Sequence, residues 1–284
     1  MKKDLKLIVK EEENLLNFLI KNIKFKSKNN VKSLLKWGNI FVNGNKVMKH
    51  DFVLKKDDVV LVVVSKRKIE DNRKDIDIIF EDSNIIVINK PNGLITISSN
   101  ETQKSAYSLV QKYLKKINKN NKLYLVHRLD RDTSGVLLFA KNINAKKMFQ
   151  ENWDKIAIKR GYKALVYDNG LKDKDTLVDY LKEKGPSVFV SKEGKKAITK
   201  YKVMQRSNGV ALVDVEIETG RKNQIRVQFG YLKCPVLGDK KYGVIKKEIN
   251  RLALHADCLI IRDPFTNKKV EFKTDIPSVF YKVL

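Results

Sequence analysis

Cysteine is nearly absent from this chain, and so are long hydrophobic runs. The two cysteines among the 284 residues are Cys234 and Cys258. Their separation matches no paired spacing, so we expect no disulfide framework and take the cytoplasm as the default compartment. The apolar run at 59–64 is far shorter than the roughly 20 residues that cross a bilayer. No apolar stretch of signal-peptide type follows residues 1–6, and we expect no membrane partner.

Histidine is scarce as well, and no pattern for binding a metal ion or a nucleotide stands out. His127, His255 and the two cysteines form no Cys-x-x-Cys or His-x-x-x-His element. Neither of the usual glycine-rich phosphate loops is present. We therefore expect no metal and no cofactor.

Acidic residues are few relative to basic ones. The chain has 33 Asp and Glu against 59 Lys and Arg, a formal net charge of +26. A general bias of the composition toward lysine, isoleucine and asparagine would not explain why acidic residues are so much fewer than basic ones. The excess indicates a polyanionic partner. Nucleic acid is favoured over a membrane surface, because no long basic amphipathic helix with bulky apolar anchors is present. Charge alone does not distinguish DNA from RNA.

Residues 1–65 have the pattern of a separate module. Apolar spacing indicates one amphipathic helix over 15–23 and a second over 31–37, which ends at Gly38. Asn43-Gly44 between apolar residues predicts a hairpin, and the apolar strand at 59–64 follows. This order resembles the αL RNA-binding module of a small-subunit ribosomal protein and of many RNA-modifying enzymes. The resemblance implies that the second helix and the hairpin face RNA, through Lys32, Lys36, Asn43 and Lys46. The alternative is a generic small α/β domain with a solvated lysine surface.

Residues 66–74 are nearly all charged or polar and read as a linker, so the second domain is expected over 75–284. There the pattern predicts strands at 76–80, 84–88 and 213–217 and helices at 106–117, 145–153 and from about residue 222. The order lacks the regular alternation of a doubly wound fold. It predicts an α+β domain with a mixed, largely antiparallel sheet flanked by helices.

Residues 127–135 are the most informative segment. They read His-Arg-Leu-Asp-Arg-Asp-Thr-Ser-Gly and lie between predicted strands at 123–126 and 136–140. Asp130 and Asp132 therefore lie on a loop held by strands, where chemistry is often found. An isolated aspartate in such a loop is more often a plain turn residue, so the loop alone does not choose between them.

The whole segment resembles the signature of the RluA-type RNA pseudouridine synthases. Four further stretches match that family in the expected order, at 89–94, 159–166, 220–227 and 251–256. The resemblance implies three catalytic residues: Asp130 as the nucleophile, Tyr162 against the base, and Arg226 paired with Asp130. It implies that Arg128 fills the space of a flipped base. Arg221 and Lys222 are expected to contact phosphates, and Asp132 is expected to fix the loop.

The chemistry accounts for these residue types. A carboxylate can attack the anomeric carbon of the sugar or C6 of the base, and the sequence leaves both routes open. A guanidinium counters the rise in pKa that burial imposes on such a carboxylate. Tyr162 offers a flat face for the base and a hydroxyl near C5. Lys222 and Arg226 are four residues apart, so on a helix they would share one face.

The chain departs from the usual family pattern at Asn223, Gln228, Ile97 and Asp263, where many relatives have histidine. This leaves the subgroup, and hence the target uridine, open. We expect a monomer that acts on large-subunit ribosomal RNA, with transfer RNA as the next candidate. The rivals are a catalytically silent RNA-binding or assembly factor on the same fold, and a nucleoside or glycoside hydrolase with paired carboxylates.

Overall fold

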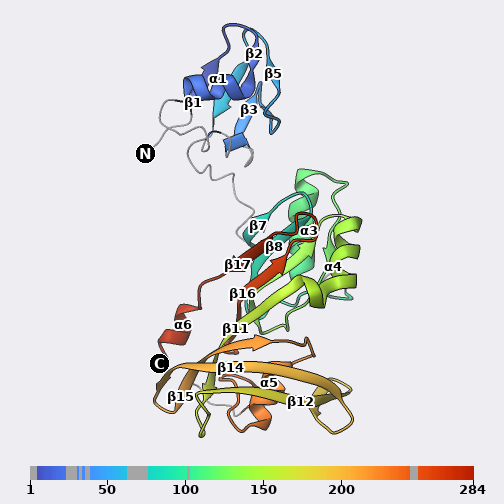
Figure 1. The fold of residues 1–284 in the computed structure, drawn as a ribbon, viewed down its shortest axis with the longest axis vertical. Helices are drawn as coiled ribbons and strands as arrows, with labels where there is room; N and C mark the ends of the chain where they lie inside the picture. The colour runs from blue at the N-terminus through green and yellow to red at the C-terminus, as the bar shows by residue number, and fades with distance from the viewer. Residues whose placement is uncertain are drawn as a thin grey trace. The chain divides into compact units, whose positions relative to one another are not determined.

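The chain divides into two compact units, Met1–Asp71 and Asn72–Leu284 (Figure 1). The computed structural model describes residues 5–23, 31, 34–35, 39–62, 76–100, 103–243 and 249–284. The predicted linker at 66–74 lies outside these residues. Within the described part of the chain, no helix combines the length and the apolar character needed to cross a membrane.

The first unit combines a four-stranded sheet with a helix around its own core. The sheet order is β1-β6-β3-β4, with bounds Leu5–Ile8, Val59–Val62, Ile40–Val42 and Asn45–Lys46. A pair of short strands, β2 (Glu13–Asn14) and β5 (Val53–Leu54), flanks the helix α1 (Leu15–Asn22). The strand β1 was not predicted. Its short, alternating pattern next to a charged stretch gives a weak signal.

The hairpin predicted at Asn43-Gly44 is confirmed. The φ angles of Asn43 and Gly44 are 47° and 81°, and a two-residue turn of type I′ needs positive values at both positions. Of the predicted second helix only Val31, Leu34 and Leu35 are described, and all three are buried in the core of this unit. The remaining residues of that helix lie outside the described part.

The second unit is built on an eleven-stranded sheet. Its order is β13-β12-β14-β15-β11-β16-β10-β8-β7, with β17 beside β16 and β9 beside β10. Every pairing is antiparallel except that of β10 with β16, which confirms the predicted mixed, largely antiparallel α+β fold. The strands are β7 (Asp77–Glu81), β8 (Ile85–Lys90), β9 (Tyr124–Leu125), β10 (Ser134–Ala140), β11 (Ala157–Tyr167), β12 (Lys174–Lys184), β13 (Ser187–Val190), β14 (Lys195–Ser207), β15 (Val210–Ile217), β16 (Leu254–Arg262) and β17 (Lys269–Lys273).

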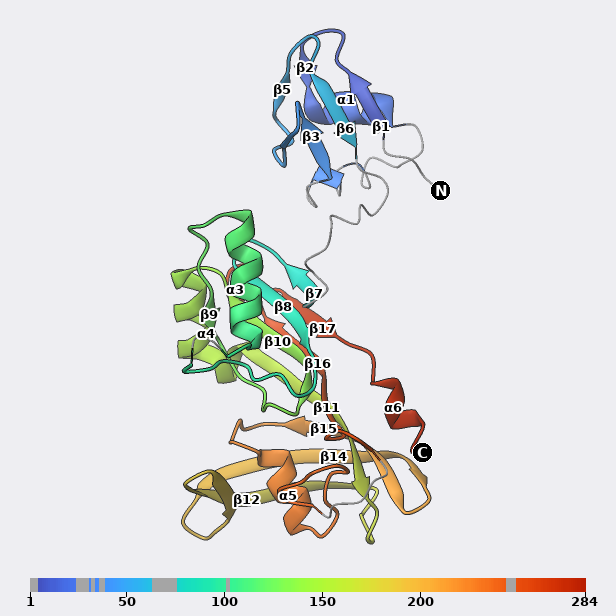
Figure 2. The ribbon, with the colours of Figure 1, turned by 180° about the vertical axis from the view of Figure 1, so that it is seen from behind.

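Helices lie on both faces of this sheet. The helix α3 (Ala106–Ile117) has the bounds that the sequence predicted, and it packs on the side chains of Leu137 and Phe139 (Figure 2). The helix α4 (Ile143–Ile156) is longer than predicted and packs on the opposite face, against Val136 and Leu138. Tyr162 joins the cluster under α3. The remaining helices are α5 (Gln224–Tyr231) and α6 (Ser278–Tyr281).

The loop between β9 and β10 is shifted from its predicted position. Ser134 and Gly135, which the sequence placed in the loop before the predicted strand at 136–140, are the first residues of β10. They pair in parallel with His255 and Ala256 of β16. The φ of Gly135 is 116°, and a Cβ atom there would lie 2.1 Å from the carbonyl oxygen of Ala256. Glycine is therefore required at this close approach of two strands.

Candidate active site

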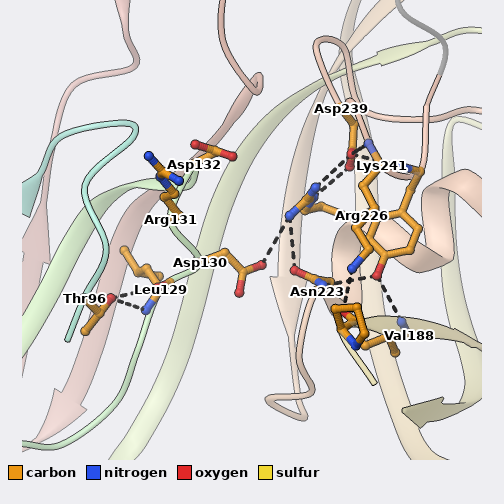
Figure 3. Close-up of polar contacts among 12 residues, drawn as sticks. Thr96, Leu129, Asp130, Arg131, Asp132, Val188, Asn223, Arg226, Asp239 and Lys241 are labelled. Atoms are coloured by element: carbon orange, nitrogen blue, oxygen red, sulfur yellow. Dashed lines mark hydrogen bonds and ion pairs between the residues drawn. The ribbon is translucent and has the colours of Figure 1, made fainter. Parts of the chain in front are cut away.

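Asp130 lies on the loop at 126–133, which a neighbouring segment holds in place. The hydroxyl of Thr96 donates to the carbonyl of Leu129 at 2.7 Å and accepts from the amide of Leu129 at 3.2 Å (Figure 3). The amide of Thr133 donates to the carbonyl of Asp130 at 3.2 Å and closes the turn. The backbone on both sides of Asp130 is thus fixed, while its carboxylate stays partly exposed.

Lys90 contacts the same loop through the carbonyl of Arg131 and is completely buried at the end of β8. Burial lowers the pKa of its ammonium group to about 8, although the nearby Asp132 and Asp130 oppose this shift. Three acceptors match the three N–H bonds of an ammonium group. These are the carbonyl oxygens of Pro91, Leu94 and Arg131, at 3.0, 2.6 and 3.0 Å.

Two buried glutamines fix α5, which carries Arg226. The side chain of Gln224 donates to the hydroxyl of Thr199 at 2.9 Å, and that hydroxyl donates to Gln228 at 2.7 Å. Both glutamines are at most 3% exposed, so one face of this short helix is locked onto β14. Arg226 projects elsewhere, into the site.

The helix begins later than predicted, and this changes the place of Lys222. Its cap is Asn223, whose left-handed φ of 53° breaks the helix from the preceding residues. Lys222 and Arg226 therefore do not share a helix face, and that prediction was wrong. Lys222 instead pairs with Glu183 at 3.0 Å.

Arg226 is held by a carboxylate that the sequence interpretation did not assign. Its Nε and Nη2 donate to the two oxygens of Asp239 at 2.7 and 2.8 Å, and its Nη1 donates to Asn223 at 3.1 Å. The backbone amides of Lys241 and Tyr242 also donate to Asp239, at 2.9 and 3.0 Å. Asp239 is fully buried, so this bidentate pair fixes the guanidinium in one orientation.

The fixed guanidinium reaches across to the loop. Its Nη1 lies 3.9 Å from Oδ2 of Asp130, which is within ion-pair range but beyond a hydrogen bond. The family resemblance implied a pair between Arg226 and Asp130. In this geometry Arg226 is bonded to Asp239 and faces Asp130 with one remaining edge (Figure 3).

The two carboxylates have opposite pKa shifts. Burial raises the pKa of Asp130, Arg226 and Arg128 pull it back, and Asp239 adds to the rise, so the net shift is upward. Burial also acts to raise the pKa of Asp239, but its hydrogen bonds from Arg226 outweigh this and the net shift is downward. Asp239 is thus the permanent counter-ion, and Asp130 is the more basic and more exposed carboxylate.

Tyr162 on β11 completes the site. It lines a cleft of about 480 Å³ together with Asp130 and Arg226. Burial raises the pKa of Tyr162 to about 12; Arg160 opposes this rise and Asp130 adds to it. The hydroxyl is therefore protonated near neutral pH. A carboxylate, a fixed guanidinium and an aromatic ring in one cleft can hold a planar base next to a nucleophile.

The predicted RNA contacts differ in what they bind within the structure. Arg128 is exposed and lines the cleft, and its side chain makes no hydrogen bond or ion pair with the described residues. Arg221 also lines the cleft and donates from Nε to the carbonyl of Lys196 at 2.9 Å. In the first unit, Asn43 uses its amide to bind Asp58 and the backbone of Val59. Lys32, Lys36 and the side chain of Lys46 lie outside the described part.

His127 and His255 have structural partners. His127 stacks on Trp153 with 4.7 Å between ring centroids, and burial lowers its pKa to about 3. His255 shares hydrogen bonds with Ser134 and Thr274. Cys234 and Cys258 are both free and buried. Among the described residues, no group of three or more potential ligands could hold a metal ion.

Sequence interpretation left Lys90 and Asp239 without a role. Lys90 stands directly after a run of buried strand residues, where a charged side chain needs buried partners, and that was an available signal. Asp239 follows Gly238 in a turn, where aspartate is ordinary. Only the folded chain brings it to Arg226.

Comparisons with known proteins identify the family to which this chain belongs. Residues 84–231 match the family model described as RNA pseudouridylate synthase. The uncharacterized RNA pseudouridine synthase YlyB of Bacillus subtilis is 33% identical over 94% of this chain and 92% of its own length. Ribosomal large subunit pseudouridine synthase C of Rickettsia bellii is 35% identical over 72% of this chain and 70% of its own length.

Among solved structures, human RNA pseudouridylate synthase domain containing 4 shares the fold. It has a TM-score of 0.61 and 23% identity, and the match covers 73% of this chain and 91% of that one. The likeness of sequence over most of the chain decides the assignment: this chain belongs to the RNA pseudouridine synthase family.

Proposed function

We propose that this RNA pseudouridine synthase isomerises uridine with Asp130 as the nucleophile, Arg226 as its charge partner and Tyr162 against the base. The observation that carries the proposal is the common cleft, about 480 Å³, that these three residues from separate segments line. Two carboxylates line this cleft, Asp130 and Glu183. Glu183 pairs with Lys222 at 3.0 Å, whereas Asp130 faces the guanidinium of Arg226 at 3.9 Å without a hydrogen bond to it. Asp239, which holds Arg226 from the other side, is saturated by four hydrogen bonds.

The reaction exchanges one bond to the ribose for another. The Asp130 carboxylate attacks either C1′ of the ribose or C6 of the uracil, and the bond between N1 and C1′ breaks with its electron pair on the base. The base turns, C5 bonds to C1′, and the carboxylate is released. C5 loses a proton and N1 gains one, so atoms and charge balance without a cofactor. The edge of Arg226 at 3.9 Å favours the ionised form of Asp130 before attack and after release.

The protonated hydroxyl of Tyr162 restricts its part. With a pKa of about 12, the hydroxyl of Tyr162 already carries its own proton near neutral pH. It is therefore not the group that accepts the proton from C5. We infer that its ring packs against the base and that it donates a hydrogen bond. A group that is released as a base later in the cycle, such as the Asp130 carboxylate itself, is better suited to accept the proton.

Arg128 is suited to the space that a flipped uridine leaves. Flipping a stacked base costs a few kcal/mol, and an exposed arginine at the cleft with no partner among the described residues is available to fill the stack. Its planar group can replace the lost stacking. Arg221 and Lys222, which also line the cleft, are proposed to contact the phosphates on either side of the uridine.

We propose large-subunit ribosomal RNA as the substrate. The support is the likeness to a relative named for the ribosomal large subunit, 35% identical over 72% of this chain. Transfer RNA stays the second candidate. A map of pseudouridines in cells with and without the gene distinguishes them, because the lost site would lie in one RNA class.

The test of the nucleophile uses two neighbouring aspartates. Asp130→Asn should lower the rate of pseudouridine formation by about 10³-fold or more, since the amide is a poor nucleophile. Asp132→Asn is the matched control on the same loop and should stay within about tenfold of wild type. The measurement is isomerisation of uridine in RNA taken from cells that lack the gene. Full activity of the Asp130 variant would refute its role.

A further inference from the structure

The segment from residue 103 to 129 has no acidic residue. Aspartate and glutamate make up 33 of the 284 residues, so a gap of this length in the second unit is unusual. Within it, five lysines lie on the last two turns of α3 and in the loop that follows: Lys112, Lys115, Lys116, Lys119 and Lys122. We call these five residues the α3 lysine patch.

The patch is exposed and unneutralised. Lys112, Lys115 and Lys116 are spaced three and four residues apart on α3, so they share one side of the helix. All five lysines are exposed, and none makes a hydrogen bond or an ion pair with a described residue. Some lysines elsewhere in the same unit are neutralised: Lys182 pairs with Glu193 at 2.8 Å and Lys200 with Glu218 at 2.6 Å.

The acidic residue next to α3 is already occupied. Glu81 of β7 accepts from the hydroxyl of Tyr113 at 2.9 Å and from the ammonium of Lys141 at 2.6 Å. It therefore offers no partner to the patch. The charge of the five lysines faces solvent.

The helix α3 connects the patch to the catalytic loop. The amides of Ala106 and Tyr107, at the start of α3, donate to the carbonyls of Ile95 and Thr96 at 2.9 Å, and Thr96 holds Leu129 beside Asp130. The helix also packs on the sheet face that Tyr162 joins. At 1.5 Å per residue, Lys112 and Lys116 lie about 9 and 15 Å along the helix from Ala106. This is about three to four base pairs of a duplex.

The patch has no free ring for stacking on a base. The hydroxyl of Tyr107 donates to the carbonyl of Leu123 at 2.8 Å, and the ring of Tyr124 is covered by Lys146 at 5.7 Å. Single strands are bound through stacking on aromatic rings, whereas paired RNA is bound through its phosphates and shape. A row of lysines without rings fits the second case.

We propose that the α3 lysine patch is a docking surface for the phosphate backbone of a double-stranded arm of the RNA substrate, at a distance from the flipped uridine. The inference rests on RNA being the substrate, as proposed above. It makes α3 a spacer between the catalytic loop and the place where the flanking duplex is held.

The test neutralises three lysines in the full-length chain. The variant Lys115→Gln/Lys116→Gln/Lys119→Gln keeps helix propensity. The control Lys268→Gln/Lys269→Gln/Lys282→Gln removes three exposed lysines elsewhere in the same unit. The probe is a labelled RNA duplex of about 20 base pairs, the length scale of known duplex-binding sites, titrated at several salt concentrations. Pseudouridine formation is measured in parallel in RNA from cells that lack the gene.

The patch variant should bind the duplex about tenfold more weakly at 0.1 M salt, with a salt slope smaller by about 0.9 for each lysine that contacts a phosphate. Its kcat should equal that of wild type, while its KM rises. The control should keep the wild-type values. Unchanged binding and salt slope, with or without a lower Tm, would overturn the proposal. So would loss of binding to anionic lipid vesicles with RNA binding intact. An inactive wild type would instead contradict the proposed function, because the binding arm does not depend on turnover.

Discussion

Arg226 serves two carboxylates, and the division between them defines the site at the scale of single residues. Asp239 takes two hydrogen bonds from the guanidinium, and Asp130 lies 3.9 Å from its remaining nitrogen. A guanidinium anchored on one side by Asp239 is kept from moving onto Asp130. It can lower the pKa of Asp130 without covering the carboxylate oxygen that attacks in the proposed reaction.

The substitution Asp239→Asn separates two effects of Asp239: the anchoring of the Arg226 guanidinium and the influence on the pKa of Asp130. The loss of a bidentate partner should let Arg226 move, which lowers kcat by about a hundredfold. The negative charge of Asp239 also raises the pKa of Asp130, so its removal should lower that pKa. Activity requires ionised Asp130 and falls as pH drops through this pKa. The acid limb of the pH profile of kcat/KM, which reports the free enzyme, should therefore shift to lower pH while the plateau falls.

The control for this change is Asp214→Asn. Asp214 pairs with Lys163, which keeps Asp257 at 3.0 Å as a second partner. The control should leave both the plateau and the acid limb near wild type. An acid limb that moves to higher pH in the Asp239 variant would contradict the stated arrangement of charges.

Sequence alone identified the candidate residues Asp130, Tyr162 and Arg226, because each stands in a matched stretch of its own. The structure brings these three together in one cleft. Sequence could not reveal Asp239, since its role depends on a contact between α5 and a turn 13 residues further along. The error over Lys222 has a local origin: Asn223 is left-handed, so the helix begins at Gln224, two residues after the predicted start near residue 222. Asparagine is among the residues that adopt this conformation readily.

At the scale of elements, the catalytic loop depends on the segment that follows β8. Lys90, Thr96 and Arg131 join the two, and the carbonyl of Gly93 accepts from Nε of Arg131 at 3.2 Å. Helix bounds were well predicted where an apolar stripe was clear, as for α3. The start of β10 was not well predicted. Its first two residues are strand residues because they pair with β16, a contact that leaves no periodic pattern in the sequence.

Lys90→Met tests this support. The methionine fills the space but removes the charged donor of three partly buried hydrogen bonds, each of which contributes about 1.5–3 kcal/mol. We expect the free energy of unfolding to fall by about 3 kcal/mol or more and kcat to drop as the loop loosens. Denaturant unfolding and single-turnover rates measure the two effects. Lys147→Met, at an exposed position of α4, should change stability by no more than about 0.5 kcal/mol. If the Lys90 variant is as stable as wild type, Lys90 does not stabilise the loop that carries Asp130.

At the scale of the whole molecule, the positive charge is shared between the units. Residues 1–71 hold 17 of the 59 basic and 9 of the 33 acidic residues, so most of the excess lies with the catalytic unit. The predicted RNA-binding role of the first unit stays a prediction. Its separate core makes the role testable by removal, since no buried residue of the catalytic clusters comes from it.

Removal of residues 1–71 should leave the rate of the chemical step unchanged and lower the affinity for RNA. The catalytic residues and their supports all lie after residue 72, so we expect kcat within about threefold of the full chain. The loss of the first unit should raise KM for long RNA about tenfold and reduce the salt slope of binding, because fewer phosphates are contacted. The measurement compares both chains on the same RNA at several salt concentrations. A circular-dichroism melt confirms that the shortened chain is folded. If KM and salt slope stay unchanged, the first unit does not bind the substrate, and its lysines are a solvated surface.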